Sequence, residues 1–240
     1  MADIGNRRFP QADGGWRVRY FSPEPEVPFC GHATIALGAA LAARGGDGEF
    51  RLQLEAATIT VEGRHGTDGS SATLSSPPAR SRPVDSGLLE RSLALLGYTG
   101  EDLDPALPPH LANAGAEHLI VALRTREALA AMDYALDRGR ALMRDAGLVT
   151  IALVHERAGG FDVRDAFASG GVLEDPATGA AAAALAGQLR DMGRPAGAFE
   201  IVQGEDMGMR SRLHVEYGSR PGSAVRVSGA VRTIRGSDDA

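Results

Sequence analysis

The chain has a single cysteine, Cys30, among its 240 residues. One cysteine excludes any disulfide within the chain, so nothing indicates a secreted, disulfide-stabilised fold. The longest run of low polarity, residues 180–189, has about half the length that a membrane-spanning helix needs. Residues 1–15 also lack the apolar centre of a signal peptide. We therefore expect a cytoplasmic protein with no membrane partner.

Sequence motifs of several common enzyme classes are missing as well. The chain contains no P-loop, no Gly-x-Ser-x-Gly segment and no His-Glu-x-x-His segment. The net charge is −6 and the arginines are scattered, which argues against nucleic acid as a partner. We expect no metal site, because five histidines follow no metal-ligand spacing. We interpret these five as surface or packing residues: His65, His110, His118, His155 and His214.

What is present is the composition of a globular protein, with 43% hydrophobic and 23% charged residues. Small and aliphatic residues fill 31–44, which predicts a helix buried on all sides. Alternating polarity predicts a hairpin over 50–63, and a Pro- and Ser-rich stretch at 75–83 predicts a linker. Further strands are expected at 16–21, 72–74, 117–123, 148–155, 160–167, 199–203, 211–217 and 224–234, and further helices at 88–97, within 125–147 and after Asp175.

The two halves of the chain share one order of features. In each half a strand and a loop lead into a helix of small residues, which ends at Gly and is followed by a segment that begins with Phe. This repeat predicts an α+β fold of two similar domains, each a largely antiparallel, barrel-like sheet around a central helix. We assign residues 1–78 plus 229–240 to the first domain and residues 79–228 to the second.

The starts of the two small-residue helices, CGHAT and DPATGA, are candidate binding sites. Helix N-termini carry unpaired N–H groups and a partial positive charge, so they bind carboxylates. Gly31 and Gly179 would let a ligand lie close to the backbone. If the two helix starts face each other, they can hold a small carboxylate substrate between them without an arginine.

Simpler roles for the same residues stay open at this point. His32 can cap its helix or pack at its start, and Cys30 can be a small buried residue. Asp175 fits an N-cap that precedes Pro176, and Glu174 then only adds negative charge near the helix start.

Four segments together resemble the PhzF-like isomerases of phenazine biosynthesis, from about residue 16 to the C-terminus: RYFSPEPEVPFCGHATIALGAAL, EDPATGAAAAAL, QGEDMGMRSRLHVE and VRVSGAV. The resemblance implies the diaminopimelate-epimerase-like fold, a site in the cleft between the two domains, and a homodimer. It also implies an enzyme that shifts a proton in a small amino or hydroxy carboxylic acid, without a metal or an organic cofactor.

The resemblance further implies a set of site residues. His32 would contact the substrate and relay a proton, and Asp175 would orient the substrate amine or share its proton. A base within reach and a place for developing negative charge are what a proton shift beside a carboxylate requires. The implied substrate-binding residues are Gly31, Ala33, Thr178, Gly179 and Ala180.

Two features depart from the family pattern. Ala180 stands where family members usually have a serine, so one side-chain donor is missing. Residues 1–15 stand where family members have the opening strands of the first domain and a SETAF-like segment with the main acid/base glutamate. We therefore expect a shortened first barrel, with exposed strand edges that favour pairing with another chain.

These departures leave two alternatives to the cofactor-independent isomerase. The chain can be a catalytically impaired or truncated PhzF-like scaffold that binds a small ligand or a protein. Thiol-based racemisation by Cys30 is the other alternative, although that chemistry usually requires two opposed thiols and this chain has one.

Overall fold

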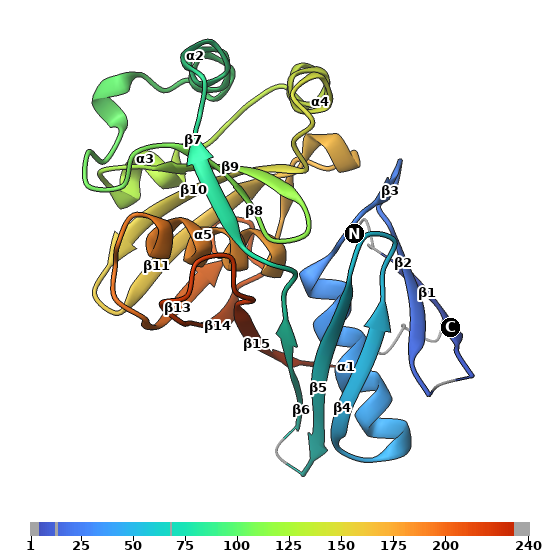
Figure 1. The fold of residues 1–240 in the computed structure, drawn as a ribbon. Coiled ribbons are helices and arrows are strands. Elements are labelled where there is room, and N and C mark those ends of the chain that lie inside the picture. The colour runs from blue at the N-terminus through green and yellow to red at the C-terminus, as the bar shows by residue number, and fades with distance from the viewer. Residues whose placement is uncertain (1–4, 13, 68, 233–240) are drawn as a thin grey trace.

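Two helices of small residues, α1 and α5, are the centres around which the strands of the computed structural model are arranged (Figure 1). The structure describes residues 5–12, 14–67 and 69–232. Figure 1 shows two lobes, which we call the α1 lobe and the α5 lobe after these helices.

The α1 lobe, residues 5–75, consists of one helix and six strands. Its elements are β1 (Gly5–Pro10), β2 (Trp16–Phe21), β3 (Glu26–Val27), α1 (Gly31–Gly45), β4 (Gly48–Gln53), β5 (Thr58–Gly66) and β6 (Gly69–Ser75).

The α5 lobe, residues 80–217, contains the other helices. Its elements are β7 (Arg80–Pro83), α2 (Ser86–Leu96), η1 (Gly100–Asp102), β8 (His110–Asn113), β9 (Glu117–Ala122), α3 (Arg126–Ala130), α4 (Leu136–Asp145), β10 (Thr150–Arg157), β11 (Gly160–Ala166), η2 (Ala168–Gly170), β12 (Glu174–Asp175), α5 (Gly179–Asp191), β13 (Gly197–Gln203) and β14 (Ser211–Tyr217).

The last described strand, β15 (Arg226–Val231), lies between β6 and β14 and joins the two lobes into one continuous sheet. The strand order is β1-β2-β4-β5-β6-β15-β14-β13-β11-β10-β9-β8-β7, with β3 paired to β2 and β12 paired to β11. The pairs β2–β4, β9–β10 and β11–β13 are parallel, and the other pairs of described strands are antiparallel.

The predicted repeat is confirmed at the level of strand pairing. In the α1 lobe, α1 connects β2 to β4, and these two strands are parallel neighbours. In the α5 lobe, α5 connects β11 to β13 in the same parallel arrangement. Each unit then continues into an antiparallel partner strand, β5 or β14. The expected α+β fold, with largely antiparallel strands around two central helices, is therefore confirmed.

Small residues let the strands approach both central helices closely. A Cβ on Gly63 of β5 would lie 2.7 Å from the carbonyl carbon of Gly38 in α1. A Cβ on Gly187 in α5 would lie 2.9 Å from the Cβ of Ala79. Every residue of α5 from Gly179 to Arg190 is buried.

The expectation that residues 31–44 are buried on all sides is wrong for one face of α1. Ala40 and Ala43 are exposed and Ala36 is half-buried. These positions lie three or four residues apart, so they form one stripe along the helix. The strands β5, β6 and β15 contact α1, and they cover only part of its circumference.

The sheet of the α5 lobe is buried on both faces, which fixes the direction of its side chains. On β9, Ile120 and Ala122 belong to the core around α5. Leu119 and Val121 belong to a second core, which includes residues of α2 and α4. Because side chains alternate along a strand, His118 lies on the face toward α5.

The predicted linker at 75–83 connects the lobes, but it is packed and ordered rather than loose. The Ser76 hydroxyl accepts a hydrogen bond from the Val225 N–H at 3.0 Å, and the Ser76 N–H donates to the Val225 carbonyl at 2.9 Å. Ala79 is fully buried, and the last four residues of the stretch form β7.

One further strand expectation needs correction, and two strands of the structure were not expected. The strand expected at 224–234 is β15, which is shorter, and residues 233 and 234 lie outside the described residues. The sequence also gave no indication of β1 or β8, which form by pairing with β2 and with β7 and β9.

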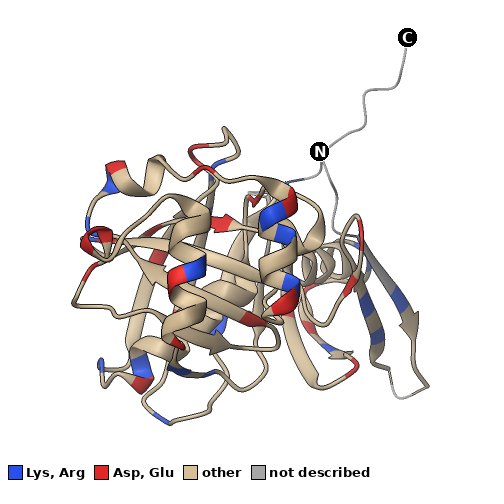
Figure 2. Cartoon of the chain, turned by 90° about the horizontal axis from the view of Figure 1, so that it is seen from above, with Lys and Arg blue, Asp and Glu red and all other residues tan. Residues whose placement is uncertain are grey.

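The distribution of charged residues and the length and apolar character of the helices bear on which partners the protein can bind. Basic and acidic residues are interspersed along the chain in the cartoon of Figure 2. Among the helices that the structure describes, none combines the length and the apolar character that a membrane span requires.

Candidate active site

The starts of α1 and α5 touch each other through their backbones. A Cβ on Gly31 would lie 2.6 Å from the Cα of Gly179 and 2.7 Å from the amide nitrogen of Ala180. Such distances leave no room for a side chain at position 31. The two helix N-termini, which are almost 150 residues apart in sequence, therefore meet at one point.

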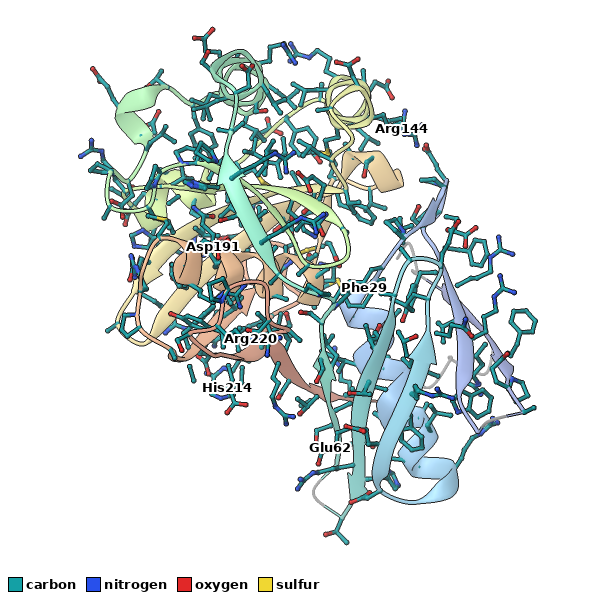
Figure 3. All side chains as sticks on the ribbon, viewed as in Figure 1. Phe29, Glu62, Arg144, Asp191, His214 and Arg220 are labelled. Atoms are coloured by element: carbon teal, nitrogen blue, oxygen red, sulfur yellow. The ribbon has the colours of Figure 1, made fainter. Side chains whose placement is uncertain are left out.

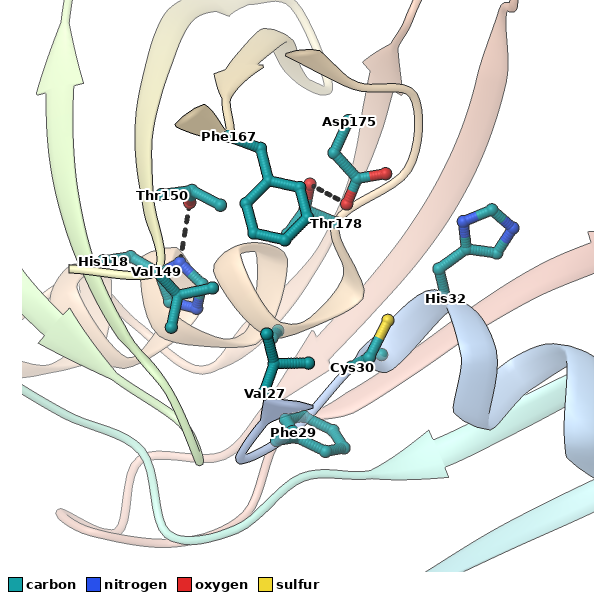
Figure 4. Close-up of a pocket in the computed structure, with 12 residues that line it drawn as sticks. Val27, Phe29, Cys30, His32, His118, Val149, Thr150, Phe167, Asp175 and Thr178 are labelled. Carbon is teal, nitrogen blue, oxygen red and sulfur yellow. Dashed lines mark hydrogen bonds between the residues drawn. The ribbon is translucent and has the colours of Figure 1, made fainter. Parts of the chain in front are cut away.

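A cavity of about 300 Å³, partly open to solvent, lies at this junction (Figure 4). This volume includes space that is open to solvent. Its wall is made of apolar side chains, of polar side chains and of backbone from both helix starts. The lining residues are Val27, Phe29, Cys30, Gly31, His32, His118, Val149, Thr150, Phe167, Asp175, Thr178 and Ala180.

Most of the residues expected at the site line this cavity, and two do not. Gly31, His32, Asp175, Thr178 and Ala180 form part of its wall. The two that do not are Gly179, which is buried against Gly31, and Ala33, whose N–H donates to the Cys30 sulfur at 3.5 Å.

Asp175 is not the helix N-cap that its position before Pro176 suggested. Helix α5 begins at Gly179, with Thr178 at the N-cap position, and Asp175 belongs to the short strand β12. The buried Asp175 carboxylate accepts a hydrogen bond from the Thr178 hydroxyl at 2.8 Å and one from the Ala177 N–H at 3.3 Å.

The protonation of Asp175 is set by burial and by His32. Burial raises the pKa of the Asp175 carboxyl above its ordinary value, because the charged form is poorly solvated. A positive charge on His32 acts in the opposite direction, as do the two hydrogen bonds that the carboxylate accepts. In Figure 4 the exposed imidazole of His32 and the carboxylate of Asp175 lie on the same side of the cavity. This pair can exchange a proton with a bound molecule.

Gln203, at the end of β13, holds the second helix start in place. Its side-chain amide donates to the Asp175 carbonyl at 2.7 Å and to the Thr178 hydroxyl at 2.9 Å. Its side-chain oxygen accepts from the Thr178 N–H at 3.0 Å. This role of Gln203 was not predicted, and the one signal for it in the sequence is its position at the start of the QGEDMG segment.

Glu174 is a buried ion-pair partner and not simply a charge near the helix start. The Arg164 guanidinium donates to the Glu174 carboxylate, with a shortest distance of 2.6 Å. The same guanidinium donates to the carbonyls of Ala130 and Met132 at 2.9 and 3.1 Å. These contacts anchor β12 to the last residue of α3 and to the segment that follows it.

Cys30 is buried at the N-cap of α1, as the simpler interpretation expected. Burial, and then the negative charge of Asp175, raises the pKa of the Cys30 thiol to about 12. A thiol with this pKa is protonated at neutral pH and is a poor base or nucleophile. This environment argues against thiol-based racemisation.

His118 packs in the interior, as expected, but it also lines the cavity. Its Nδ1 hydrogen-bonds with the Thr150 hydroxyl at 2.8 Å, and its Nε2 has no partner. Burial lowers the pKa of His118 to about 3, so its ring is neutral. The other four histidines outside the helix starts do not line this cavity: His65, His110, His155 and His214.

Asp165 on β11 lies opposite Asp175 in the sheet register. Asp165 is fully buried, and neither of its carboxylate oxygens has a hydrogen-bond partner of normal geometry. Burial raises the pKa of Asp165 to about 7, against the weaker influence of the Thr150 and Thr178 hydroxyls. The sequence analysis did not single out this residue.

No glutamate is part of the cavity wall among the described residues. The first glutamate of the chain, Glu24, pairs with Arg140 at 2.9 Å and with Arg144 at 2.6 Å across the two lobes. Within the described ranges, no group of three or more His, Cys, Asp or Glu side chains is arranged to hold a metal ion.

Comparisons with known proteins agree with this architecture. Among curated proteins, the chain is 32% identical to a protein named "Uncharacterized isomerase" of Deinococcus radiodurans, covering 93% of this chain and 77% of that protein. It is also 32% identical to trans-2,3-dihydro-3-hydroxyanthranilate isomerase of Pseudomonas aeruginosa, covering 92% of this chain and 77% of that enzyme.

A solved structure from Pseudomonas aeruginosa, described as a "Predicted Epimerase", superposes with a TM-score of 0.81 at 26% sequence identity. The match covers 96% of this chain and 81% of that one. Residues 7–236 match the family PhzC-PhzF, described as "Phenazine biosynthesis-like protein". With the paired helix starts and the repeated strand–helix–strand unit, this match over nearly the whole length shows that the chain belongs to the PhzC-PhzF family of phenazine biosynthesis-like proteins.

Proposed function

We propose that the protein is an isomerase or epimerase that shifts a proton within a small amino or hydroxy carboxylic acid, without a metal or an organic cofactor. The observation that carries this proposal is the meeting of His32, Asp175 and two helix N-termini at one cavity. The names of two relatives, one of which is trans-2,3-dihydro-3-hydroxyanthranilate isomerase, support the reaction class.

In this proposal the helix starts bind the substrate carboxylate. The first N–H groups of a helix have no partner within the helix, and the helix dipole adds partial positive charge. Gly31 belongs to one start, and Thr178, Gly179 and Ala180 belong to the other. None of the arginines that the structure describes is part of the cavity wall. As electron density moves toward the carboxylate during proton removal, the same groups stabilise it.

His32 and Asp175 then move the proton. His32 accepts the proton from a carbon near the carboxylate, and the electron pair of the broken C–H bond delocalises toward the carboxylate. Asp175 donates its proton to the carbon that carries the new C–H bond in the product. The delocalised electron pair forms this bond, so the carbon skeleton is again uncharged. Burial raises the pKa of Asp175, which favours the protonated carboxyl that this step requires.

Solvent-deuterium incorporation tests this assignment. Candidate acids, beginning with trans-2,3-dihydro-3-hydroxyanthranilate, are incubated with the protein in D₂O and followed by proton NMR. Asp175→Asn and His32→Gln should each lower the exchange rate by about 100-fold or more, the usual contribution of an acid or base. Asp137→Asn and His214→Gln are matched controls, since both residues are exposed and lie outside the cavity wall (His214 in Figure 3). Exchange at the wild-type rate in Asp175→Asn would overturn the role of Asp175.

The second candidate function is a PhzF-like scaffold that binds a small carboxylate or a protein without turning over a substrate. The pairing of Glu24 with Arg140 and Arg144, away from the cavity wall, favours this candidate, because it leaves the cavity without a glutamate as acid or base. Titration calorimetry separates the two candidates. Binding of a carboxylic acid with no exchange in D₂O for any bound acid would support the scaffold.

We also propose a cytoplasmic homodimer. Among the described strands β1 pairs only with β2, and the side chain of Phe9 on β1 is exposed. An open strand edge of this kind can pair with a second copy of the chain. Light scattering coupled to size-exclusion chromatography should give twice the chain mass of 25.0 kDa, and a monomer at micromolar concentration would contradict the proposal.

A further inference from the structure

The cavity has a second polar end, formed by His118. In Figure 4 His118 and His32 lie at opposite ends of the residues that line the cavity. The ring of His118 is fully buried, yet its Nε2 has no hydrogen-bond partner. Buried ring nitrogens are normally paired, because an unpaired one loses its bond to water without replacement. A missing partner at the wall of a cavity indicates a group that a bound molecule supplies.

The sheet holds the His118 ring in one orientation. His118 of β9 and Thr150 of β10 are direct neighbours in the parallel register, and both side chains lie on the face toward α5. The hydrogen bond between Nδ1 and the Thr150 hydroxyl, 2.8 Å long, fixes the rotation of the ring. A rigid part of the fold therefore holds the His118 ring at the cavity wall.

The His118 ring is also uncharged. Burial lowers its pKa to about 3, and among the described residues no carboxylate contributes to this shift. A neutral imidazole offers one hydrogen bond to an uncharged group. It offers no compensation for a second carboxylate or an ammonium group, which would be costly to bury at this end.

The wall between the two polar ends is apolar. Val27, Phe29, Val149 and Phe167 line the cavity between the helix starts and His118. A ligand that follows this wall would carry a carboxylate at one end, an apolar body in the middle and an uncharged hydrogen-bonding group at the other end.

We propose that His118 Nε2 is a specificity-determining contact, which hydrogen-bonds with a hydroxyl or similar uncharged group of the substrate at the end away from its carboxylate. Thr150 is then a positioning residue, which holds the ring. The inference rests on the proposed function only for the placement of the carboxylate at the helix starts. Dicarboxylic acids and acids with a distal ammonium group are excluded by the same contact.

A binding experiment with simple probes tests the contact without any turnover. Benzoate, 3-hydroxybenzoate, 4-hydroxybenzoate and isophthalate are titrated into protein with ¹⁵N-labelled histidine, and the Nε2 resonance of His118 is followed by NMR. One hydroxybenzoate should bind about five- to tenfold more tightly than benzoate, the effect of one net hydrogen bond, and should shift the Nε2 resonance. Isophthalate should bind more weakly than that hydroxybenzoate.

Three variants make the experiment specific. His118→Leu should bind benzoate and the hydroxybenzoates equally, while His118→Gln should keep part of the preference because its amide can still hydrogen-bond. His110→Leu, on the neighbouring strand and outside the cavity wall, should keep the full preference. If His118→Leu does not fold, the NMR titration of the wild type and the affinities of His118→Gln still show whether His118 contacts the hydroxyl group.

Three results would overturn the inference. They are an Nε2 resonance that is identical in free and bound protein, an equal affinity for benzoate and both hydroxybenzoates, and no binding of any probe at millimolar concentration. If the protein catalyses deuterium exchange but shows no preference for a hydroxybenzoate, the His118 contact is rejected and the proposed function still holds. If it prefers a hydroxybenzoate but catalyses exchange into no acid, the proposed function is rejected and the His118 contact still holds.

Discussion

The backbones of Gly31 and Gly179 touch at the point where the two central helices begin, since a Cβ on Gly31 would lie 2.6 Å from the Cα of Gly179. The atoms that such a Cβ would overlap belong to the backbone, which cannot rotate aside as a side chain can. This contact fixes the distance between the two helix N-termini, and so it brings both of them to the same cavity.

Gly31→Ala should therefore destabilise the protein, although alanine is the better helix former. The overlap should exceed the gain in helix propensity and lower the unfolding free energy by about 1–3 kcal/mol. Gly45→Ala in the same helix is the matched control, because nothing lies within 4 Å of a Cβ there, and it should be neutral or slightly stabilising. Urea unfolding followed by circular dichroism measures both. Equal stability of the two variants would contradict the close contact.

Asp165→Asn should change how stability depends on pH. The pKa of Asp165 is about 7 in the folded protein against an ordinary value of 3.8, so the folded state binds the proton more tightly than the unfolded state. The unfolding free energy of the wild type should then fall as the pH rises from about 4 to about 7, and stay level above that range with respect to this group. The asparagine variant should lose this slope and gain stability at pH 8, by an amount on the order of a few kcal/mol.

Thermal or urea unfolding at pH 5 and pH 8 provides the comparison for Asp165. Asp137→Asn is the control, since that side chain is exposed on α4 and its replacement should leave the slope unchanged. Parallel pH profiles of the wild type and Asp165→Asn would show that Asp165 is not a buried carboxyl with a raised pKa.

Gln203→Met should disturb the second helix start without adding bulk. The change removes three hydrogen bonds that hold the Asp175 carbonyl, the Thr178 N–H and the Thr178 hydroxyl. It leaves buried polar groups unpaired, which should cost about 2–4 kcal/mol of unfolding free energy. Deuterium exchange into the substrate should fall by at least about tenfold at a pH and temperature where the variant is folded. Gln11→Met, on the first turn, is the control, and an equal loss in both variants would argue against the role of Gln203.

Cys30 should behave as an inert thiol. Its pKa of about 12 and its burial at the N-cap of α1 leave almost no thiolate at pH 8. Reaction with a chromogenic disulfide should therefore be slow in the folded protein and fast after unfolding in urea, and Cys30→Ser should keep most of the exchange activity. Rapid stoichiometric labelling of the native protein, together with loss of exchange in Cys30→Ser, would restore thiol-based racemisation as the better account.

Local patterns in the sequence predicted the elements that carry their own signals. The helices expected at 31–44 and after Asp175 are marked by small residues and a terminal Gly, and the hairpin over 50–63 by alternating polarity. The repeat of these signals was enough to predict the two central helices and the strands that wrap them. By contrast, β1 has the sequence GNRRFP, without clear alternation, and forms because β2 pairs with it.

The parts of the site that were missed depend on distant contacts. Asp175 looked like an N-cap because Pro176 follows it, but pairing with β11 and the hydrogen bonds of Gln203 place it in a strand instead. His118 and Asp165 carry no local signal, since their burial follows from the packing of β9 and β11 against α5. The exposed stripe of α1 has the same origin, because a run of alanines does not show which face the strands will cover.

A crystal structure with a bound small carboxylic acid tests the central claim most directly. We expect the carboxylate to lie at the junction of the helices, with its oxygens about 3 Å from backbone nitrogens at the start of α1 and at the start of α5. The rest of the molecule should lie beside His32 and Asp175. A carboxylate bound to only one helix start, or bound away from both, would contradict the claim that the two starts form one site.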